Sequence, residues 1–80
     1  MNQQILKDLE DRFIFASNRW PKHPSLQHSA WVIKEEYEEF NELLRAKDDE
    51  FPLDKIYNEL IDIMNTCYRA IIDNNLLSEK

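Results

Sequence analysis

Residues 26–44 read LQHSAWVIKEEYEEFNELL, and apolar side chains recur along this stretch at spacings of four and three residues. This period matches one face of an α-helix, so we predict a helix here with a single apolar stripe. Ser25 directly precedes the stretch and can cap the first turn through its side-chain oxygen. The predicted stripe consists of Leu26, Ala30, Ile33, Tyr37, Phe40 and Leu44.

An amphipathic helix is also predicted on the N-terminal side of this stretch. Its apolar positions recur every three or four residues. A loop is expected to follow, because the residues that precede Pro21 and Pro24 are pushed away from helical angles. The apolar positions of this first helix are Ile5, Leu9, Phe13, Ala16 and Trp20.

A third helix is predicted after the charged residues 45–50, where the apolar stripe of the second helix ends. Pro52 suits the first turn of the third helix, which fades near residues 74–75. Its expected central stripe, facing the second helix, consists of Ile56, Leu60, Ile63, Cys67 and either Ala70 or Ile71. The chain is therefore predicted to be all-α, a three-helix chain with an antiparallel helical hairpin.

Length and composition restrict the function of the chain. Its 80 residues predict one domain, 1–80, and no linker or repeat divides them. The formal charge of −6 argues against a sequence-independent grip on a nucleic acid polymer. The first residues are too polar for a signal peptide and no apolar run is long enough for a membrane span, so we expect a cytoplasmic protein. The absence of glycine excludes phosphate-binding glycine loops.

Four carboxylates are expected to meet between the second and third predicted helices. At about 100° per residue, Glu36 and Glu39 fall on one flank of the apolar stripe of the second helix. Glu59 and Asp62 fall on the matching flank of the third helix, so an antiparallel hairpin brings both pairs to one side. Counting about 1.5 Å per residue from the connection puts the two pairs at nearly the same height.

Such a cluster must take up protons or cations, because carboxylates about 4 Å apart repel by roughly 4 kcal/mol per pair at an effective dielectric of about 20. Hard oxygen ligands without a histidine or thiol favour Mg²⁺, with Mn²⁺ next. Two alternatives stay open. The acidic run could be only a solvated face, and Glu35 and Glu38 have the same spacing as Glu36 and Glu39, although they point away from the third helix.

The two acidic motifs, taken together, resemble a known family over about residues 13–72. Glu35-Glu36-x-x-Glu39 followed by Glu59-x-x-Asp62 is similar to the paired motifs of the MazG-like all-α nucleoside triphosphate pyrophosphohydrolases, which include dimeric dUTPase-like and dCTP pyrophosphatase branches. Residues 19–26, RWPKHPSL, resemble the segment ahead of the first motif in the dCTP-type branch. The family often has glycine before the aspartate of the second motif, where this chain has isoleucine, and this departure concerns local helix packing.

The resemblance implies hydrolysis between the α- and β-phosphates of a nucleoside triphosphate, releasing a monophosphate and pyrophosphate. It implies that Glu36, Glu39, Glu59 and Asp62 hold Mg²⁺. It also implies that Glu35 and Glu36 are the catalytic carboxylates, with Glu35 orienting or deprotonating the attacking water.

Substrate contacts are expected at Trp20, His23, Lys55 and Arg69. Trp20 and His23 would border a base pocket, although Trp20 could instead pack in the core and His23 could be an ordinary loop residue. Lys55 and Arg69 are candidates for contacts to the triphosphate, and the alternative for Arg69 is an ion pair with Asp73 at i+4.

The third predicted helix also has a second apolar face, which one hairpin and one short helix cannot cover. We therefore predict a homodimer or homotetramer with a four-helix-type core. The alternative function is a small acidic helical interaction or regulatory module, including a catalytically silent relative, in which the carboxylates only solvate a helix face. The residues of the second face are Tyr57, Ile61, Met64, Tyr68 and Ile72.

Overall fold

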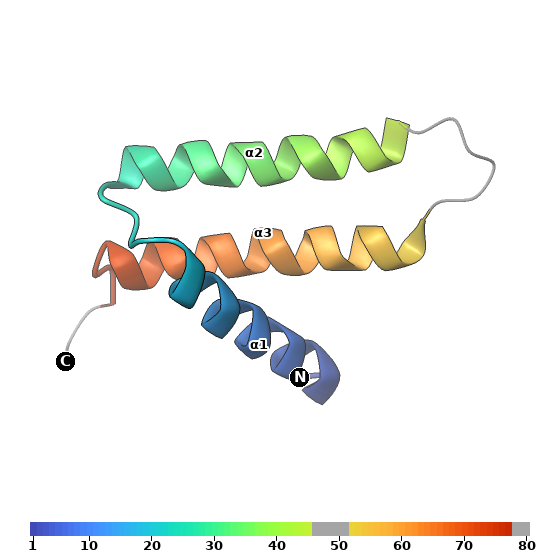
Figure 1. Ribbon diagram of the computed structural model, residues 1–80, viewed down its shortest axis with the longest axis horizontal. Coiled ribbons are helices and arrows are strands. Elements are labelled where there is room, and N and C mark those ends of the chain that lie inside the picture. Colours follow the sequence, from blue (N-terminus) through green and yellow to red (C-terminus); the bar gives the residue numbers. More distant parts are fainter. Residues whose placement is uncertain (46–51, 78–80) are drawn as a thin grey trace.

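The computed structural model describes residues 1–45 and 52–77, and all regular structure within these ranges is helical. Helix α1 spans Gln3–Arg19, α2 spans Leu26–Arg45 and α3 spans Leu53–Asp73 (Figure 1). The prediction of an all-α chain with three helices is confirmed. The predicted charged connection after the second helix lies outside the described residues. None of the three helices is both long and apolar enough to cross a membrane.

The helix ends follow from local side-chain chemistry. The side chain of Asn2 accepts a hydrogen bond from a backbone N–H of the first turn of α1, and α1 ends at Trp20, which is extended before a proline. Ser25 Oγ accepts a bond of 3.0 Å from the backbone N–H of His28, so the predicted cap of α2 is confirmed. Pro52 is the residue just before α3 rather than part of its first turn.

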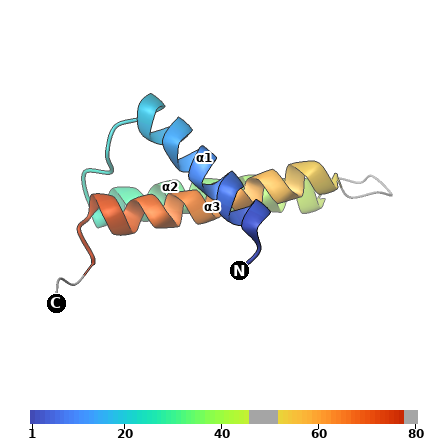
Figure 2. The ribbon, with the colours of Figure 1, turned by 90° about the horizontal axis from the view of Figure 1, so that it is seen from below.

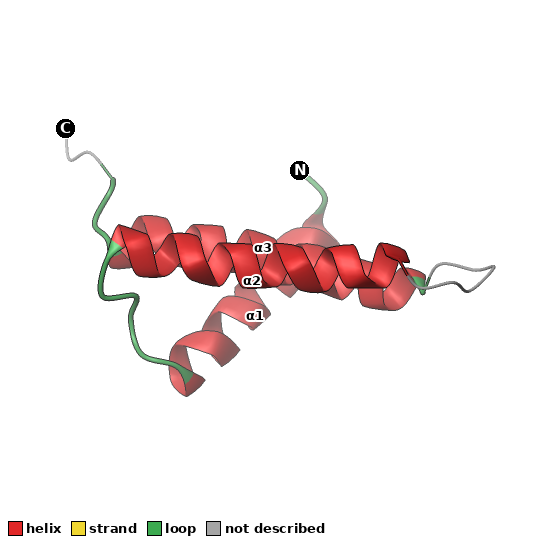
Figure 3. Cartoon of the chain, turned by 90° about the horizontal axis from the view of Figure 1, so that it is seen from above, coloured by secondary structure: helices red, strands yellow, loops and turns green. Residues whose placement is uncertain are grey.

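Helix α3 is the element against which both other helices pack. Helices α2 and α3 lie side by side, and the chain runs in opposite directions along them (Figure 1). Helix α1 crosses α3 at an angle and leaves the plane of the other two helices (Figures 2 and 3). No Cα atom of α1 lies within 8 Å of a Cα atom of α2. The two helices thus flank α3 without packing on each other.

This arrangement changes which face of α3 is buried. The predicted central stripe is wrong at Leu60, which is 42% exposed, whereas Ile61 is only 2% exposed. Because α1 and α2 contact α3 from two directions, the most enclosed line of α3 runs between the two contacts. Ile61 occupies the position that is often glycine in the family that the motifs resemble, and its side chain is almost fully buried here. The buried residues of α3 are Ile61, Asn65, Thr66, Arg69 and Ala70.

Replacing Ile61 by alanine is expected to lower the free energy of unfolding by about 2–4 kcal/mol, because a buried side chain is removed and a cavity remains. Ile14 is a matched control on α1, since it is 51% exposed. The Ile14→Ala variant should change stability by less than about 1 kcal/mol. Urea unfolding followed by circular dichroism measures both variants. Equal losses would show that Ile61 is not a central packing residue.

Candidate functional site

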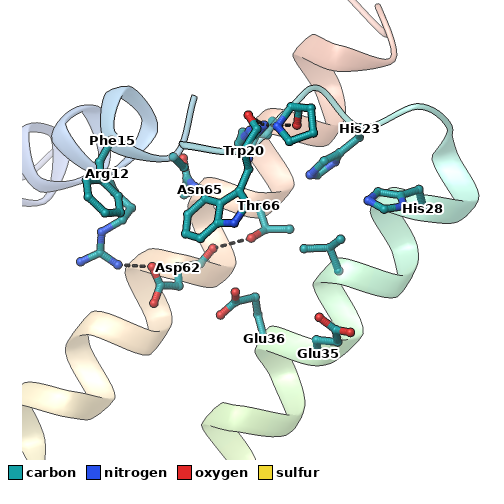
Figure 4. A pocket seen from close by; sticks show the side chains of 14 residues that line it. Arg12, Phe15, Trp20, His23, His28, Glu35, Glu36, Asp62, Asn65 and Thr66 are labelled. Carbon is teal, nitrogen blue, oxygen red and sulfur yellow. Dashed lines mark hydrogen bonds and ion pairs between the residues drawn. The ribbon is translucent and has the colours of Figure 1, made fainter. Parts of the chain in front are cut away.

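A cavity of about 860 Å³ lies between α1 and α2, and α3 completes its wall together with the segment that joins α1 to α2 (Figure 4). Its volume falls within the range of about 300–1,000 Å³ that is usual for small-molecule pockets. Because α1 and α2 do not pack on each other, the cavity is a direct result of the way α1 crosses α3. Acidic, basic and aromatic side chains all contribute to its lining.

Three carboxylates meet beside this cavity, and two of them line it. Glu36 from α2 and Glu59 and Asp62 from α3 each have an oxygen that lies within 4.8 Å of the other two. Glu36 and Asp62 also line the cavity and point toward each other in Figure 4. The spacing of three residues on α3 sets both of its carboxylates on one flank of that helix. Glu39, one turn beyond Glu36, is exposed and lies outside this group of three.

The environment of the cluster disfavours its charged form. Burial and the neighbouring carboxylates Glu39, Asp62 and Glu59 raise the pKa of Glu36 from 4.5 to about 7. Burial is also the main reason that the pKa of Glu59 is raised, and Glu39 and Asp62 act in the same direction. At neutral pH the cluster is therefore poised to exchange protons for a cation.

The donor set of the cluster fits a hard divalent cation such as Mg²⁺. One oxygen of Glu36 and one of Glu59 are buried and have no hydrogen-bond donor among the described residues. Glu39 can share a hydrogen bond with either of them only when one carboxyl group of the pair carries a proton, so the ionised cluster lacks donors. Carboxylate oxygens without histidine or thiol ligands are typical of Mg²⁺ and Mn²⁺ sites.

The raised pKa of Glu36 gives stability a defined pH dependence. Between pH 4.5 and about 7 the folded chain keeps a proton on Glu36 that the unfolded chain has released. The contribution of Glu36 to stability is therefore full below pH 4.5 and is lost as the pH rises to about 7. The lowered pKa of buried His23 has the opposite effect, since its protonation destabilises the fold as the pH falls.

We therefore expect the stability of the metal-free wild type, relative to that of Glu36→Gln, to fall as the pH rises from about 4.5 to about 7. Taking the difference between the two proteins removes the effect of His23, which is present in both. Urea unfolding in EDTA at a series of pH values measures the difference. A constant difference across this range would mean that Glu36 has an ordinary pKa.

Arg12 is the functional candidate that the sequence interpretation missed. It extends from α1, forms an ion pair with Asp62, and donates a hydrogen bond of 3.1 Å from Nη2 to Asn58 Oδ1. It also lines the cavity (Figure 4). One signal was available, because Arg12 is a cation four residues before Ala16 on the apolar side of the first helix.

The other predicted catalytic and substrate residues take different positions. Glu35 is exposed at the cavity edge and lies beside Glu36, on the side away from Asp62 (Figure 4). Trp20 lines the cavity with 52% of its surface exposed, so the alternative of core packing is wrong. Lys55 is exposed and is not among the residues that line the cavity.

His23 and Arg69 are buried in a polar network that ties the segment joining α1 and α2 to the end of α3. The backbone N–H of His23 donates a bond of 2.9 Å to Asp73, and its ring nitrogen Nδ1 lies 2.6 Å from Ser29 Oγ. Arg69 lies 3.8 Å from Asp73, as its alternative interpretation expected, and donates a bond of 2.7 Å to the carbonyl of Pro21. His23 is thus a buried and hydrogen-bonded residue, in contrast to the alternative of an ordinary loop residue.

Asn65 is a further cavity residue that the sequence interpretation did not select. It is 5% exposed, and its side-chain oxygen has no hydrogen-bond partner among the described residues. Because a buried amide without a partner is costly, this oxygen is a ready acceptor for a bound molecule. His28 lines the same cavity from the first turn of α2.

Comparisons of the chain with protein-family models, with curated proteins and with solved structures found no match.

Proposed function

We propose that the chain is a Mg²⁺-dependent nucleoside triphosphate pyrophosphohydrolase that cleaves the bond between the α- and β-phosphates. The observation that carries this proposal is the meeting of Glu36, Glu59 and Asp62, of which Glu36 and Asp62 line a cavity of about 860 Å³. A triphosphate brings negative charge to a site that is already acidic, so a divalent cation is required between them. Magnesium bound to phosphate is the usual solution for such a site.

Different residues of the chain would bind the ion and accept the proton in this reaction. Glu36, Glu59 and Asp62 would hold the ion, and Glu39, a neighbouring carboxylate of Glu36 and Glu59, would join them. An ion held by these residues would neutralise charge on phosphate oxygens and make a nearby water easier to deprotonate. Glu35, at the cavity edge, would take a proton from the attacking water. As the oxygen of this water bonds to phosphorus, the bond between that phosphorus and the bridging oxygen breaks, and monophosphate and pyrophosphate separate.

The base and sugar would lie in the opposite part of the cavity. The half-exposed ring of Trp20 offers a stacking surface, and the unpartnered oxygen of Asn65 can accept a hydrogen bond from an amino or hydroxyl group. Arg69 and His23 also line this cavity, where Arg69 Nη2 donates to the carbonyl of Pro21 and His23 Nδ1 lies against Ser29 Oγ. Lys55 contributes no contact in this proposal.

The same proposal includes a homodimer with a four-helix-type core, or a homotetramer built from it. Only Ala16, Ile61 and Ala70 are buried apolar residues in the described ranges, which is a small core for a stable monomer. Large apolar side chains stay exposed on α3, and a second copy would cover them. They include Tyr57, Leu60, Met64, Tyr68, Ile71 and Ile72. Light scattering that found a monomer at micromolar concentration would exclude this assembly.

The test of the activity is incubation of the full chain with a panel of canonical, deoxy and modified nucleoside triphosphates in the presence of Mg²⁺. We expect release of pyrophosphate and the matching monophosphate, and no release in excess EDTA. Release of inorganic phosphate with a diphosphate product would place the cleavage at the wrong bond. No product with any substrate would reject the activity.

One observation favours the second candidate function, a small acidic interaction module without catalysis. Asp62 already has a cationic partner in Arg12, so one of the three carboxylates does not need a metal for charge balance. In this case Mg²⁺ should leave the melting temperature unchanged, because a ligand must bind the native state to stabilise it. A rise in melting temperature with Mg²⁺ favours the metal site.

A further inference from the structure

The ion pair between Arg12 and Asp62 joins α1 to the acidic cluster. The side chains of both residues are 28% exposed, so the pair is partly shielded from water. Asn58 Oδ1 accepts a hydrogen bond of 3.1 Å from Nη2, the second terminal nitrogen of the Arg12 guanidinium group. Because α1 does not pack on α2, this pair is a direct link from α1 to the carboxylates that face α2.

Arg12 differs from Arg69, the other arginine of the cavity wall. Arg69 is 6% exposed and is engaged by the carbonyl groups of Trp20 and Pro21 and by Asp73. These partners belong to the fold and have no part in the acidic cluster. Arg12 has a partner that is itself one of the three candidate metal ligands, so its charge interacts directly with whatever occupies the cluster.

We propose that Arg12 is the resident counter-ion of the metal-free cluster, that it is displaced from Asp62 when Mg²⁺ binds, and that it then contacts the phosphate groups of the substrate. This inference rests on the proposed function. A guanidinium group cannot lose its proton, so Arg12 and a divalent ion repel each other when both approach Asp62. Its planar set of donors matches phosphate oxygens, and its place in the cavity wall puts it beside a bound triphosphate.

The proposal predicts opposite effects on two binding equilibria. Replacing Arg12 by glutamine removes the competing charge, so Mg²⁺ alone should bind roughly tenfold more tightly. The same replacement removes a phosphate contact, so inorganic tripolyphosphate at saturating Mg²⁺ should bind roughly tenfold more weakly. A merely structural role for Arg12 would weaken both equilibria or leave both unchanged.

The experiment uses calorimetry with Mg²⁺ alone, a Mn²⁺ titration followed by the paramagnetic resonance of free Mn²⁺, and tripolyphosphate at saturating Mg²⁺. Lys7→Gln is the matched control, because it removes one positive charge from α1 at a side chain that is 69% exposed and pairs with Asp11. It should change neither equilibrium by more than about twofold. Arg12→Lys keeps the charge and should bind Mg²⁺ like the wild type but tripolyphosphate more weakly.

The outcomes separate this inference from the proposed function. A wild type that binds Mg²⁺, with an Arg12→Gln variant of equal or weaker Mg²⁺ affinity, overturns the inference and leaves the proposed function in place. A wild type that binds neither Mg²⁺ nor Mn²⁺ and hydrolyses no triphosphate overturns both the inference and the proposed function. Circular dichroism confirms that each variant keeps its helices, and should Arg12→Gln lose them, Arg12→Lys decides through its tripolyphosphate affinity.

Discussion

The Glu36→Gln variant is expected to hydrolyse nucleoside triphosphates about 100- to 1000-fold more slowly than the wild type and to lose the rise in melting temperature caused by Mg²⁺. Glutamine keeps the size of the side chain but removes the charge that a hard cation requires. Glu36 is the residue of the cluster that comes from α2, so its loss leaves both remaining ligands on α3.

This variant has a second expected property that separates a site defect from a folding defect. In the wild type, burial and the neighbouring carboxylates disfavour the ionised form of Glu36 and raise its pKa to about 7. The neutral glutamine removes this cost, so at pH 8 the metal-free variant should be more stable than the metal-free wild type. An inactive variant that is also less stable at pH 8 would indicate damage to the fold instead.

Glu38→Gln is the matched control for this experiment. Glu38 lies two residues further along α2, is exposed, and is 3.8 Å from Lys34. The spacing of the acidic run allowed either Glu36 and Glu39 or Glu35 and Glu38 to face α3, and the structure brings Glu36 to Glu59 and Asp62. Hydrolysis should therefore be nearly unchanged in Glu38→Gln. Equal losses in both variants would contradict this register.

The sequence was sufficient for the features that depend on one helix or on two neighbouring helices. The period of three and four residues predicted the three helices, because each buries one side against a neighbour. The angular positions of Glu36 and Asp62 placed them on facing flanks, since helix geometry converts residue number into direction. Ser25 and the prolines located the helix ends for reasons of hydrogen bonding and sterics.

The main features that the sequence did not predict depend on where α1 lies in space. Periodicity does not specify the angle at which α1 crosses α3, so the ion pair between Arg12 and Asp62 could not be predicted from it. The position of Trp20 at a pocket was expected from the sequence, and the structure places this residue in the cavity wall. Periodicity also predicted that the most enclosed line of α3 would be apolar, whereas in the structure this line carries Asn65 and Arg69. Polar residues can lie there because the cavity and the backbone carbonyls of the connecting segment supply their surroundings.

Replacing Arg69 by alanine is expected to lower the free energy of unfolding by about 3–5 kcal/mol, a large share of the 5–15 kcal/mol typical of a domain. The change would leave the carboxylate of Asp73 buried without its cation and would remove the donor that holds the carbonyls of Trp20 and Pro21. The segment between α1 and α2 would then lose an anchor on α3. Thermal and urea unfolding followed by circular dichroism measure the loss.

The pair of Lys34 and Glu38 provides a control with the same geometry. Both pairs are spaced at i and i+4 and both have an N–O distance of 3.8 Å, but the side chains of Lys34 and Glu38 are 71% and 59% exposed, against 8% and 7% for Arg69 and Asp73. Lys34→Ala should therefore cost less than about 0.5 kcal/mol, because water screens an exposed pair. Arg69→Lys keeps the charge but not the planar donor group, so its loss should lie between the two. Similar small losses for Lys34→Ala and Arg69→Ala would mean that the buried network does not stabilise the fold, and that the segment carrying Trp20 is held in place by apolar packing alone.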